Sequence, residues 1–243
     1  MKISVFFFFI FQFIYCQNIE ATYSIKEYYT INPNDYDDQM LVNVLKRRES
    51  LIKKNTENLL INIICSRNQY YFSAPDKMSS DNRTISNSSI VYNLLRLKQN
   101  VLYANGSTFY FNNHHPFVTK LDVKTVKWQI FNETKIINGL ECLKAVPLIN
   151  KDNSYHKLLD GLEVWFSPKI NYVGGPTYFA NLPGLIITLK TDFVKFQLID
   201  IKETNNKIPD TIEFLNKKNI KTFDESEKYY AEIRNNLLET TRN

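Results

Sequence analysis

Three histidines are the first residues of the sequence that could hold a metal ion or move a proton. His114 and His115 are adjacent, and adjacent side chains on an extended strand point to opposite faces, which is a poor arrangement for chelating one ion. His156 lies in a polar stretch, and no HExxH or CxxC spacing accompanies any of the three. The sequence therefore predicts no metal site and no cofactor, with the histidines at the surface.

The sequence also gives little indication of nucleophilic or acid–base catalysis. Cys142 would need exposure and an activating histidine, but Leu140 and Val146 share its even register, which predicts a buried strand face. No Gly-x-Ser-x-Gly elbow, P-loop or dinucleotide fingerprint occurs. We expect no catalytic residue and no enzyme activity. An unrecognised secreted hydrolase using Glu133, Glu163 and the histidines is the alternative.

Aromatic side chains are the candidates for ligand binding, because several of them flank the glycine-rich part of the chain. One interpretation is that they fill the core and brace the turns. The other is that they line an apolar pocket or a partner-binding groove on one face of a curved sheet. The five candidates are Trp128, Trp165, Phe166, Tyr178 and Phe179.

Glycine and proline are concentrated in one part of the chain. Five of the six glycines and four of the eight prolines lie between Gly139 and Gly184. Glycine serves backbone conformations with positive φ and close backbone approach, so residues 128–201 should bend tightly. A structural turn of the type II kind is predicted, with proline and glycine at its centre. Its residues are Asn181, Leu182, Pro183, Gly184 and Leu185.

The first 16 residues resemble a targeting segment. Lys2 precedes an apolar run at residues 5–15, which has the length of a signal core and is too short for a membrane span. We expect cleavage after Cys16. The alternative is a lipoprotein signal in which Cys16 is lipidated. Either way the sequence predicts export to the periplasm or the extracellular space, with association with the outer membrane if a lipid is attached.

The charge bears on which partners the protein can bind, and the cysteine content bears on whether it forms a disulfide. The formal net charge is +5, and basic and acidic residues are interspersed, so nucleic acid is not expected as a partner. Cys65 and Cys142 remain after cleavage. In an oxidising compartment they could form a disulfide, and two buried free thiols are the alternative.

Hydrophobic periodicity predicts many short strands, one early helix and a helical end. Residues 37–54 have apolar residues spaced by threes and fours, with bases near the end, as in an amphipathic helix that packs on a sheet or lies on a membrane surface. Asn105-Gly106 predicts a two-residue hairpin. Capping residues at Asp210 and at Thr222 with Glu225 predict two late helices. Strands are expected at 21–30, 59–63, 70–72, 90–97, 101–103, 108–111, 118–123, 126–130, 135–148, 162–166, 186–189 and 193–201, with a loop at 74–89 and a turn at 131–134.

This pattern predicts a mainly β protein, with a curved antiparallel sheet or half-barrel, one early helix and a C-terminal helical tail. The predicted organisation is a signal peptide at 1–16, a β domain at 17–204 and a tail at 205–243. Within the β domain, residues 126–201 form the central part.

The central part resembles the GLPGLI family of secreted bacterial proteins, common in Bacteroidetes. The matching positions extend from Trp128 to Ile186 and end on the NLPGLI motif, in which Asn181 stands where the family has glycine. The resemblance implies a β-rich fold and export from a Gram-negative envelope, and it assigns no biochemical activity. The matching residues are Trp128, Ile130, Glu133, Thr134, Lys135, Ile137, Gly139, Cys142, Lys144, Ala145, Val164, Trp165, Phe166, Ser167, Pro168, Ile170, Gly175, Pro176, Phe179, Leu182, Pro183, Gly184, Leu185 and Ile186.

We expect an exported, non-enzymatic envelope protein that binds a lipid or other apolar ligand, or an outer-membrane or secreted protein, on one face of the sheet. The motivation is the export segment, the strand pattern and aromatic residues without catalytic neighbours. A hydrolase is one alternative. The other is a structural subunit of an envelope assembly, whose tail helix at residues 222–238 docks a partner.

Overall fold

The computed structural model describes residues 18–29, 37–73, 91–92, 94–111, 116–152, 154–216 and 219–240. The expected signal segment with Cys16, the pair His114 and His115, and the loop 74–89 lie outside these residues.

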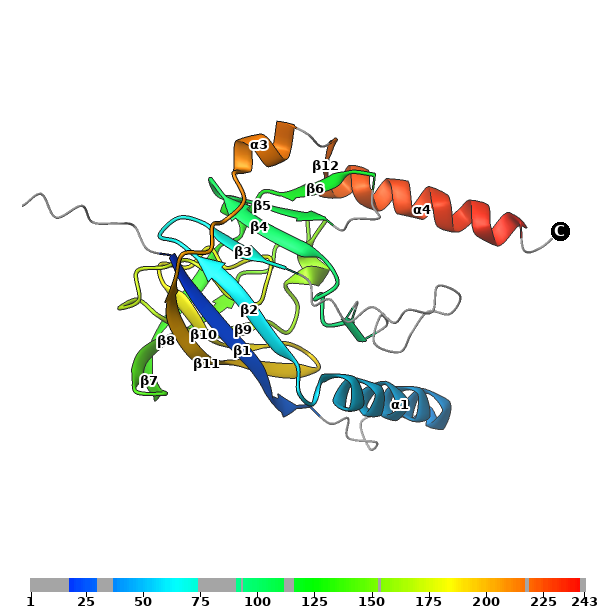
Figure 1. The fold of residues 1–243 in the computed structure, drawn as a ribbon. Helices are drawn as coiled ribbons and strands as arrows, with labels where there is room; N and C mark the ends of the chain where they lie inside the picture. Colours follow the sequence, from blue (N-terminus) through cyan, green and yellow to red (C-terminus); the bar gives the residue numbers. More distant parts are fainter. Residues whose placement is uncertain are drawn as a thin grey trace, which may run out of the picture.

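In the described part of the chain, twelve strands form one sheet, which is not closed into a barrel (Figure 1). Its order is β12-β6-β5-β4-β3-β2-β1-β11-β10-β9-β8-β7, so β12 and β7 are the edges. Neighbouring strands pair antiparallel, except β12 with β6. The strands are β1 (Asn18–Tyr28), β2 (Leu60–Cys65), β3 (Tyr70–Phe72), β4 (Asn100–Ala104), β5 (Ser107–Phe111), β6 (Val118–Leu121), β7 (Trp128–Ile137), β8 (Leu140–Pro147), β9 (Glu163–Ser167), β10 (Leu185–Lys190), β11 (Val194–Thr204) and β12 (Ile220–Thr222).

Among the described residues, the helices lie mostly towards the two ends of the chain. Those with described bounds are α1 (Gln39–Thr56), α3 (Thr211–Asn216), α4 (Phe223–Thr240) and the short 3-10 turns η2 (Val123–Thr125) and η3 (His156–Leu158). The predicted fold class is therefore confirmed: a mainly β, curved antiparallel sheet with an early helix and a C-terminal helix.

Two Asn-Gly turns shape the hairpins. Asn105-Gly106 joins β4 to β5 with φ of 53° and 77°, as a type I′ turn requires, which confirms the predicted hairpin. Asn138-Gly139 joins β7 to β8 in the same way, with φ of 53° and 78°. The predicted turn at 131–134 and single strand at 135–148 are therefore wrong.

The irregular pairing of β7 with β8 also changes which residues are buried. Their register shifts between Ile130 and Thr134, a bulge that breaks the simple alternation. Cys142 is buried, as predicted, and so is Ala145. Leu148, predicted on the same buried face as Cys142, is 50% exposed.

Two further expectations about secondary structure are corrected. Residues 91, 92 and 94, predicted in a strand, are helical, and the Leu95 N–H donates to the Val91 carbonyl at 2.9 Å. The tail, predicted as helices alone, also contributes β12, which extends the sheet beside β6.

The inside of the curved sheet is filled by the chain itself. Most of residues 174–182 are buried there. Hydroxyl groups on β3 and β5 bind backbone carbonyls of this segment, and a hydroxyl group on β1 binds a carbonyl of β10. Tyr70 Oη donates to the Thr177 carbonyl (2.8 Å), Thr108 Oγ1 to the Tyr178 carbonyl (2.6 Å) and Tyr23 Oη to the Ile186 carbonyl (2.7 Å). The glycine-rich segment therefore serves as packing inside the sheet.

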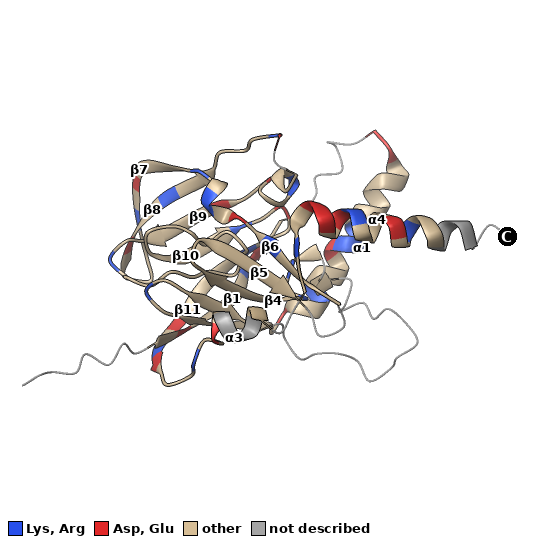
Figure 2. Cartoon of the chain, turned by 90° about the horizontal axis from the view of Figure 1, so that it is seen from above, with Lys and Arg blue, Asp and Glu red and all other residues tan. Residues whose placement is uncertain are grey.

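α1 and α4 extend from the same side of the sheet (Figures 1 and 2). The predicted early helix is confirmed, with Asp38 Oδ1 accepting the amides of Met40 (2.8 Å) and Leu41 (3.2 Å) as an N-cap. The predicted capping box of α4 is also present, because the Thr222 amide donates to Glu225 Oε2 at 2.7 Å and the Glu225 amide to Thr222 Oγ1 at 3.3 Å.

Candidate functional site

The predicted aromatic residues are mostly part of the core. Trp165, Phe166 and Phe179 are buried. Trp128 is half-buried, and its Nε1 donates to Asn181 Oδ1 at 2.8 Å. Among these five residues, Tyr178 is the one that lines the cavities described below.

The NLPGLI segment is a structural bend. The Gly184 amide donates to the Leu182 carbonyl at 2.9 Å, so a three-residue turn around Pro183 stands in place of the expected type II turn. A Cβ on Gly184 would lie 2.3 Å from the Ser167 carbonyl oxygen. The Asn181 amide group donates to the carbonyls of Val123 (2.9 Å) and Val126 (3.4 Å), which ties the bend to the residues before β7.

The two cysteines are free and buried, so the disulfide is not formed. Cys65 is on β2 and Cys142 on β8, five strand positions apart in the sheet order, whereas a disulfide needs Cα atoms about 4.4–6.8 Å apart. Burial raises the pKa of the Cys142 thiol to about 11 and raises that of Cys65 further. Both groups are therefore neutral packing residues near neutral pH.

The carboxylates proposed for a hydrolase both lie near Lys144, and neither lines the groove that contains His156. Lys144 Nζ lies 3.1 Å from Glu163 and 3.9 Å from Glu133, on β9 and β7. His156 instead lines a groove beside η3. Among the described residues, no group of three His, Cys, Asp or Glu side chains is placed to hold a metal ion. No described helix is long and apolar enough to cross a membrane.

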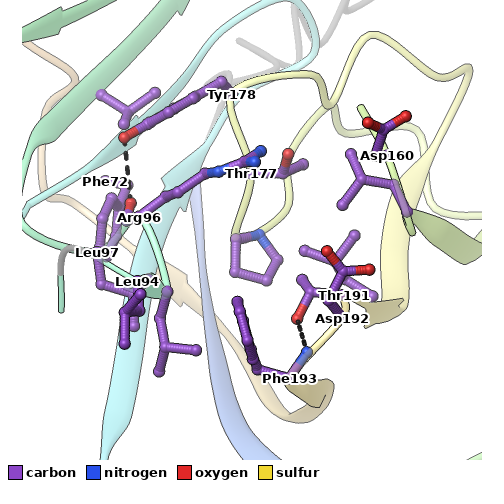
Figure 3. A pocket seen from close by; sticks show the side chains of 15 residues that line it. Phe72, Leu94, Arg96, Leu97, Asp160, Thr177, Tyr178, Thr191, Asp192 and Phe193 are labelled. Atoms are coloured by element: carbon purple, nitrogen blue, oxygen red, sulfur yellow. Dashed lines mark hydrogen bonds between the residues drawn. The ribbon is translucent and has the colours of Figure 1, made fainter. Parts of the chain in front are cut away.

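A small inner pocket lies between residues 94–97, the chain around Tyr178 and the β10–β11 turn (Figure 3). Its volume is about 50 Å³, which is room for a few water molecules. Phe72, Leu97 and Phe193 give it apolar walls, and Arg96, Asp160 and Asp192 add charge.

Arg96 connects this inner pocket to the surface. Its φ is +59°, a left-handed conformation that is uncommon for a non-glycine residue and often found at functional sites. Its guanidinium donates to the carbonyls of Leu158 and Lys157 (3.1 Å for Lys157), which fixes η3 against the segment that precedes β4. Burial lowers the pKa of Arg96 from its ordinary value, and interactions with Tyr178, Asp192 and Asp160 oppose that change.

A larger outer groove lies on the other side of Arg96. Its volume is about 600 Å³, and Arg96 and Tyr178 line both cavities. Tyr110 and Tyr178 stack with ring centroids 5.1 Å apart and planes 14° apart, and Tyr178 Oη donates to Gln99 Oε1 at 3.1 Å. The remaining lining residues are Lys98, Ser154, His156, Lys157, Leu158, Phe223 and Glu227.

The outer groove combines an aromatic wall with cationic groups. Arg96, Lys98 and Lys157 carry positive charge, against one carboxylate, Glu227. Burial raises the pKa of Tyr110 and of Tyr178, so both phenols stay neutral. Such a surface can stack on a planar or apolar body and can neutralise an acidic group.

Sequence reasoning identified only Tyr178 and His156 among the groove residues. Arg96 falls inside the incorrectly predicted strand 90–97, and no motif marks Tyr110, Lys98 or Lys157. These residues come from β5, η3 and the segment before β4, and the start of α4 completes the lining, so the groove exists only after the sheet has formed.

No protein-family model matches the chain, and no curated protein matches it. Among solved structures, PNGF-II in two space groups matches at 18% identity and a TM-score of 0.48, over 85% of this chain and 31% of that one. An uncharacterized conserved protein from Thermus thermophilus matches at 8% identity and a TM-score of 0.29, over 73% of this chain and 98% of that one. The chain thus spans about a third of the PNGF-II structures, and likenesses at these scores carry no conclusion about function.

Proposed function

We propose that the protein is an exported, non-enzymatic binding protein of the cell envelope, and that the outer groove holds its ligand. The ligand class that fits is a small molecule with a planar or apolar body and an acidic group. The observation that carries this proposal is the stacked pair Tyr110 and Tyr178, with Arg96, Lys98 and Lys157 around the same cavity.

The size of the groove supports the same conclusion. About 600 Å³ falls within the range of about 300–1,000 Å³ typical of small-molecule sites. Phe223 adds a further ring, and the side chains of Lys98 and Lys157 are exposed, so they can reach a bound anion. The proposed binding site is therefore the groove, whereas Trp165, Phe166 and Phe179 belong to the core.

We also propose that the chain belongs to the GLPGLI family. The motif residues Pro183 and Gly184 form a bend in which any side chain at position 184 would meet the Ser167 backbone, which is a reason for a sequence to retain glycine there. At position 181, where the family has glycine, this chain has asparagine, and its side chain makes three hydrogen bonds.

Titration with anilinonaphthalene sulfonate, an anionic fluorescent probe with a planar naphthalene body, tests the binding proposal. We expect saturable binding to the folded protein. The double variant Lys98→Glu with Lys157→Glu should bind about tenfold more weakly or worse, because each cation contributes a charge-assisted contact. The control is Lys127→Glu with Lys207→Glu, which changes the same charge at exposed sites outside the groove lining. Absence of saturable binding, or equal weakening in both variants, contradicts the proposal.

A second candidate is hydrolysis in the same groove, favoured by one observation: Ser154, His156 and Glu227 all line it. A hydroxyl, an imidazole and a carboxylate are the groups that nucleophilic acyl transfer needs. Turnover of p-nitrophenyl acetate that is lost in Ser154→Ala, with probe binding retained, would support this candidate. Turnover that is absent in the wild type, or unchanged in the variant, would exclude it.

A further inference from the structure

The first half of α1 presents apolar side chains that the sheet does not cover. Met40 is 76% exposed, Val44 53% and Leu41 41%, while the buried residues of this helix are Val42, Ile52 and Thr56. At 3.6 residues per turn, Met40 and Val44 lie on one side of the helix together with the half-buried Leu51. We call these three residues the apolar stripe.

Positive charge is concentrated on the same helix. α1 has five basic residues and one acidic residue, Glu49, so it carries +4 of the chain's formal net charge of +5. Helical geometry places Arg47 and Lys54 along one border of the apolar stripe and Arg48 along the other. The basic residues are Lys46, Arg47, Arg48, Lys53 and Lys54.

A cavity with apolar and charged walls lies between α1 and the β10–β11 turn. It has a volume of about 230 Å³; Leu45, Ile52 and Phe193 are among its apolar walls, and Arg48, Glu49 and Asp192 add charge. The Arg48 guanidinium lies 5.4 Å from the centre of the Phe193 ring. Two carboxylates line the same cavity, so the cavity is not suited to an anionic head, and an anionic surface would meet the exposed face of α1 instead.

We propose that α1 docks the protein on an anionic lipid surface. The apolar stripe enters the boundary between headgroups and acyl chains, and the bordering cations face lipid phosphates, as in interfacial amphipathic helices.

A lipid surface explains these features better than a protein partner does. The exposed apolar residues lie on a projecting helix between bordering cations, which is the arrangement of an interfacial helix on an anionic membrane, and a fluid surface needs no complementary shape. α4 projects from the same side but begins with Asp224, Glu225 and Glu227, which an anionic surface would repel. Docking is therefore assigned to α1 alone.

Co-sedimentation of the full chain with lipid vesicles tests this proposal. We expect binding to vesicles of phosphatidylcholine with about one third phosphatidylglycerol, and much weaker binding to phosphatidylcholine alone. Arg47→Glu with Lys54→Glu should weaken binding about 25-fold or more, since each basic residue near an anionic surface contributes about fivefold. Met40→Asp with Val44→Asp should weaken it about tenfold or more.

Matched variants separate docking from general effects. Lys127→Glu with Lys207→Glu changes the same charge elsewhere, and Ile233→Asp places a charge at an apolar residue of α4 that is 40% exposed. Both should bind as the wild type does, and circular dichroism should show that every variant keeps its fold. No binding to phosphatidylglycerol vesicles, or equal weakening in the controls, overturns the proposal. If the protein does not bind phosphatidylglycerol vesicles, a protein partner becomes the remaining explanation for the exposed apolar stripe.

Discussion

Asn181 and Gly184 hold the same bend by different means. Asn181 uses its amide group, which joins the Trp128 ring to the carbonyls of Val123 and Val126. Gly184 is needed because it has no side chain. Its φ is +149°, and the Ser167 backbone passes close beside it. The bend at residues 181–185 is thus defined by hydrogen bonds on one side and by close backbone approach on the other.

Replacing Gly184 by alanine should lower the free energy of unfolding by about 2–4 kcal/mol, because the new Cβ would lie 2.3 Å from backbone that cannot easily move. Gly139→Ala is the matched control. It meets no atom within 4 Å, so only its positive φ should cost stability, about 1 kcal/mol. Urea unfolding followed by tryptophan fluorescence measures both. Equal losses would show that contact at Gly184 is unimportant.

The cysteines allow a second test at this scale. Because burial raises the pKa of Cys142 to about 11 and raises that of Cys65 as well, neither thiol should react with a disulfide reagent at about pH 8 in the native protein. After denaturation without reductant, both Cys65 and Cys142 should react. Failure of both to react after denaturation would mean that they form a disulfide.

At the scale of elements, the start of α4 depends on one carboxylate. The Thr222 amide and hydroxyl both bind Glu225 Oε2, at 2.7 and 3.0 Å. These hydrogen bonds lower the pKa of Glu225 from its ordinary value. A lowered pKa in the folded state means that the cap is complete above the ordinary glutamate pKa and is lost as pH falls through the folded value.

We therefore expect exchange of the Thr222 amide proton to become faster relative to the rest of the sheet as the solution is acidified from neutral pH. Glu225→Gln should show the faster exchange already at neutral pH, and its exchange should depend little on acid. NMR-detected hydrogen exchange measures this. An acid response of equal size in Glu225→Gln would show that the cap is not responsible.

Most elements of the fold could be predicted from sequence because their signals are local. Alternation located β1, apolar spacing located α1, and Asn105-Gly106 located one hairpin. Asn138-Gly139 is the same dipeptide, but the apolar residues at even positions between Ile136 and Leu148 favoured one continuous strand. The register shift near Ile130 has no local signal, since it depends on how β7 pairs with β8.

The candidate site was less accessible to sequence reasoning. Tyr110 and Tyr178 are distant in sequence and stack only because residues 174–182 fill the curved sheet beside β5. Arg96 acquires its role from a positive φ and from contacts with η3. A long-range arrangement of ordinary residue types leaves no motif.

At the scale of the whole molecule, buried tyrosines connect distant parts of the chain, because Tyr70 on β3 binds the segment inside the sheet and Tyr23 on β1 binds β10. Tyr23 and Tyr70 are fully buried and donate to backbone carbonyls, and burial raises the pKa of both. Tyr29, near the surface, has its pKa raised to about 12 by burial and by Glu27. A raised tyrosine pKa contributes stability that is complete below the ordinary value and is lost as pH rises towards the folded value.

Stability should therefore fall steeply as pH rises above about 10, the ordinary tyrosine pKa. Absorbance of ionised tyrosine should increase cooperatively, together with loss of the β-sheet signal in circular dichroism, because the buried phenols ionise only when the sheet opens. Gradual ionisation of all tyrosines near pH 10 without unfolding would contradict the burial of Tyr23 and Tyr70.

Binding of a planar anion in the outer groove is tested most directly by chemical-shift mapping of isotopically labelled protein with anilinonaphthalene sulfonate. We predict that the perturbed amides gather at residues 96–99, 110, 154–158, 178 and 223–227. Perturbations centred instead on Trp165 and the strands β7–β9, or no localised perturbation, would contradict a ligand site in the groove.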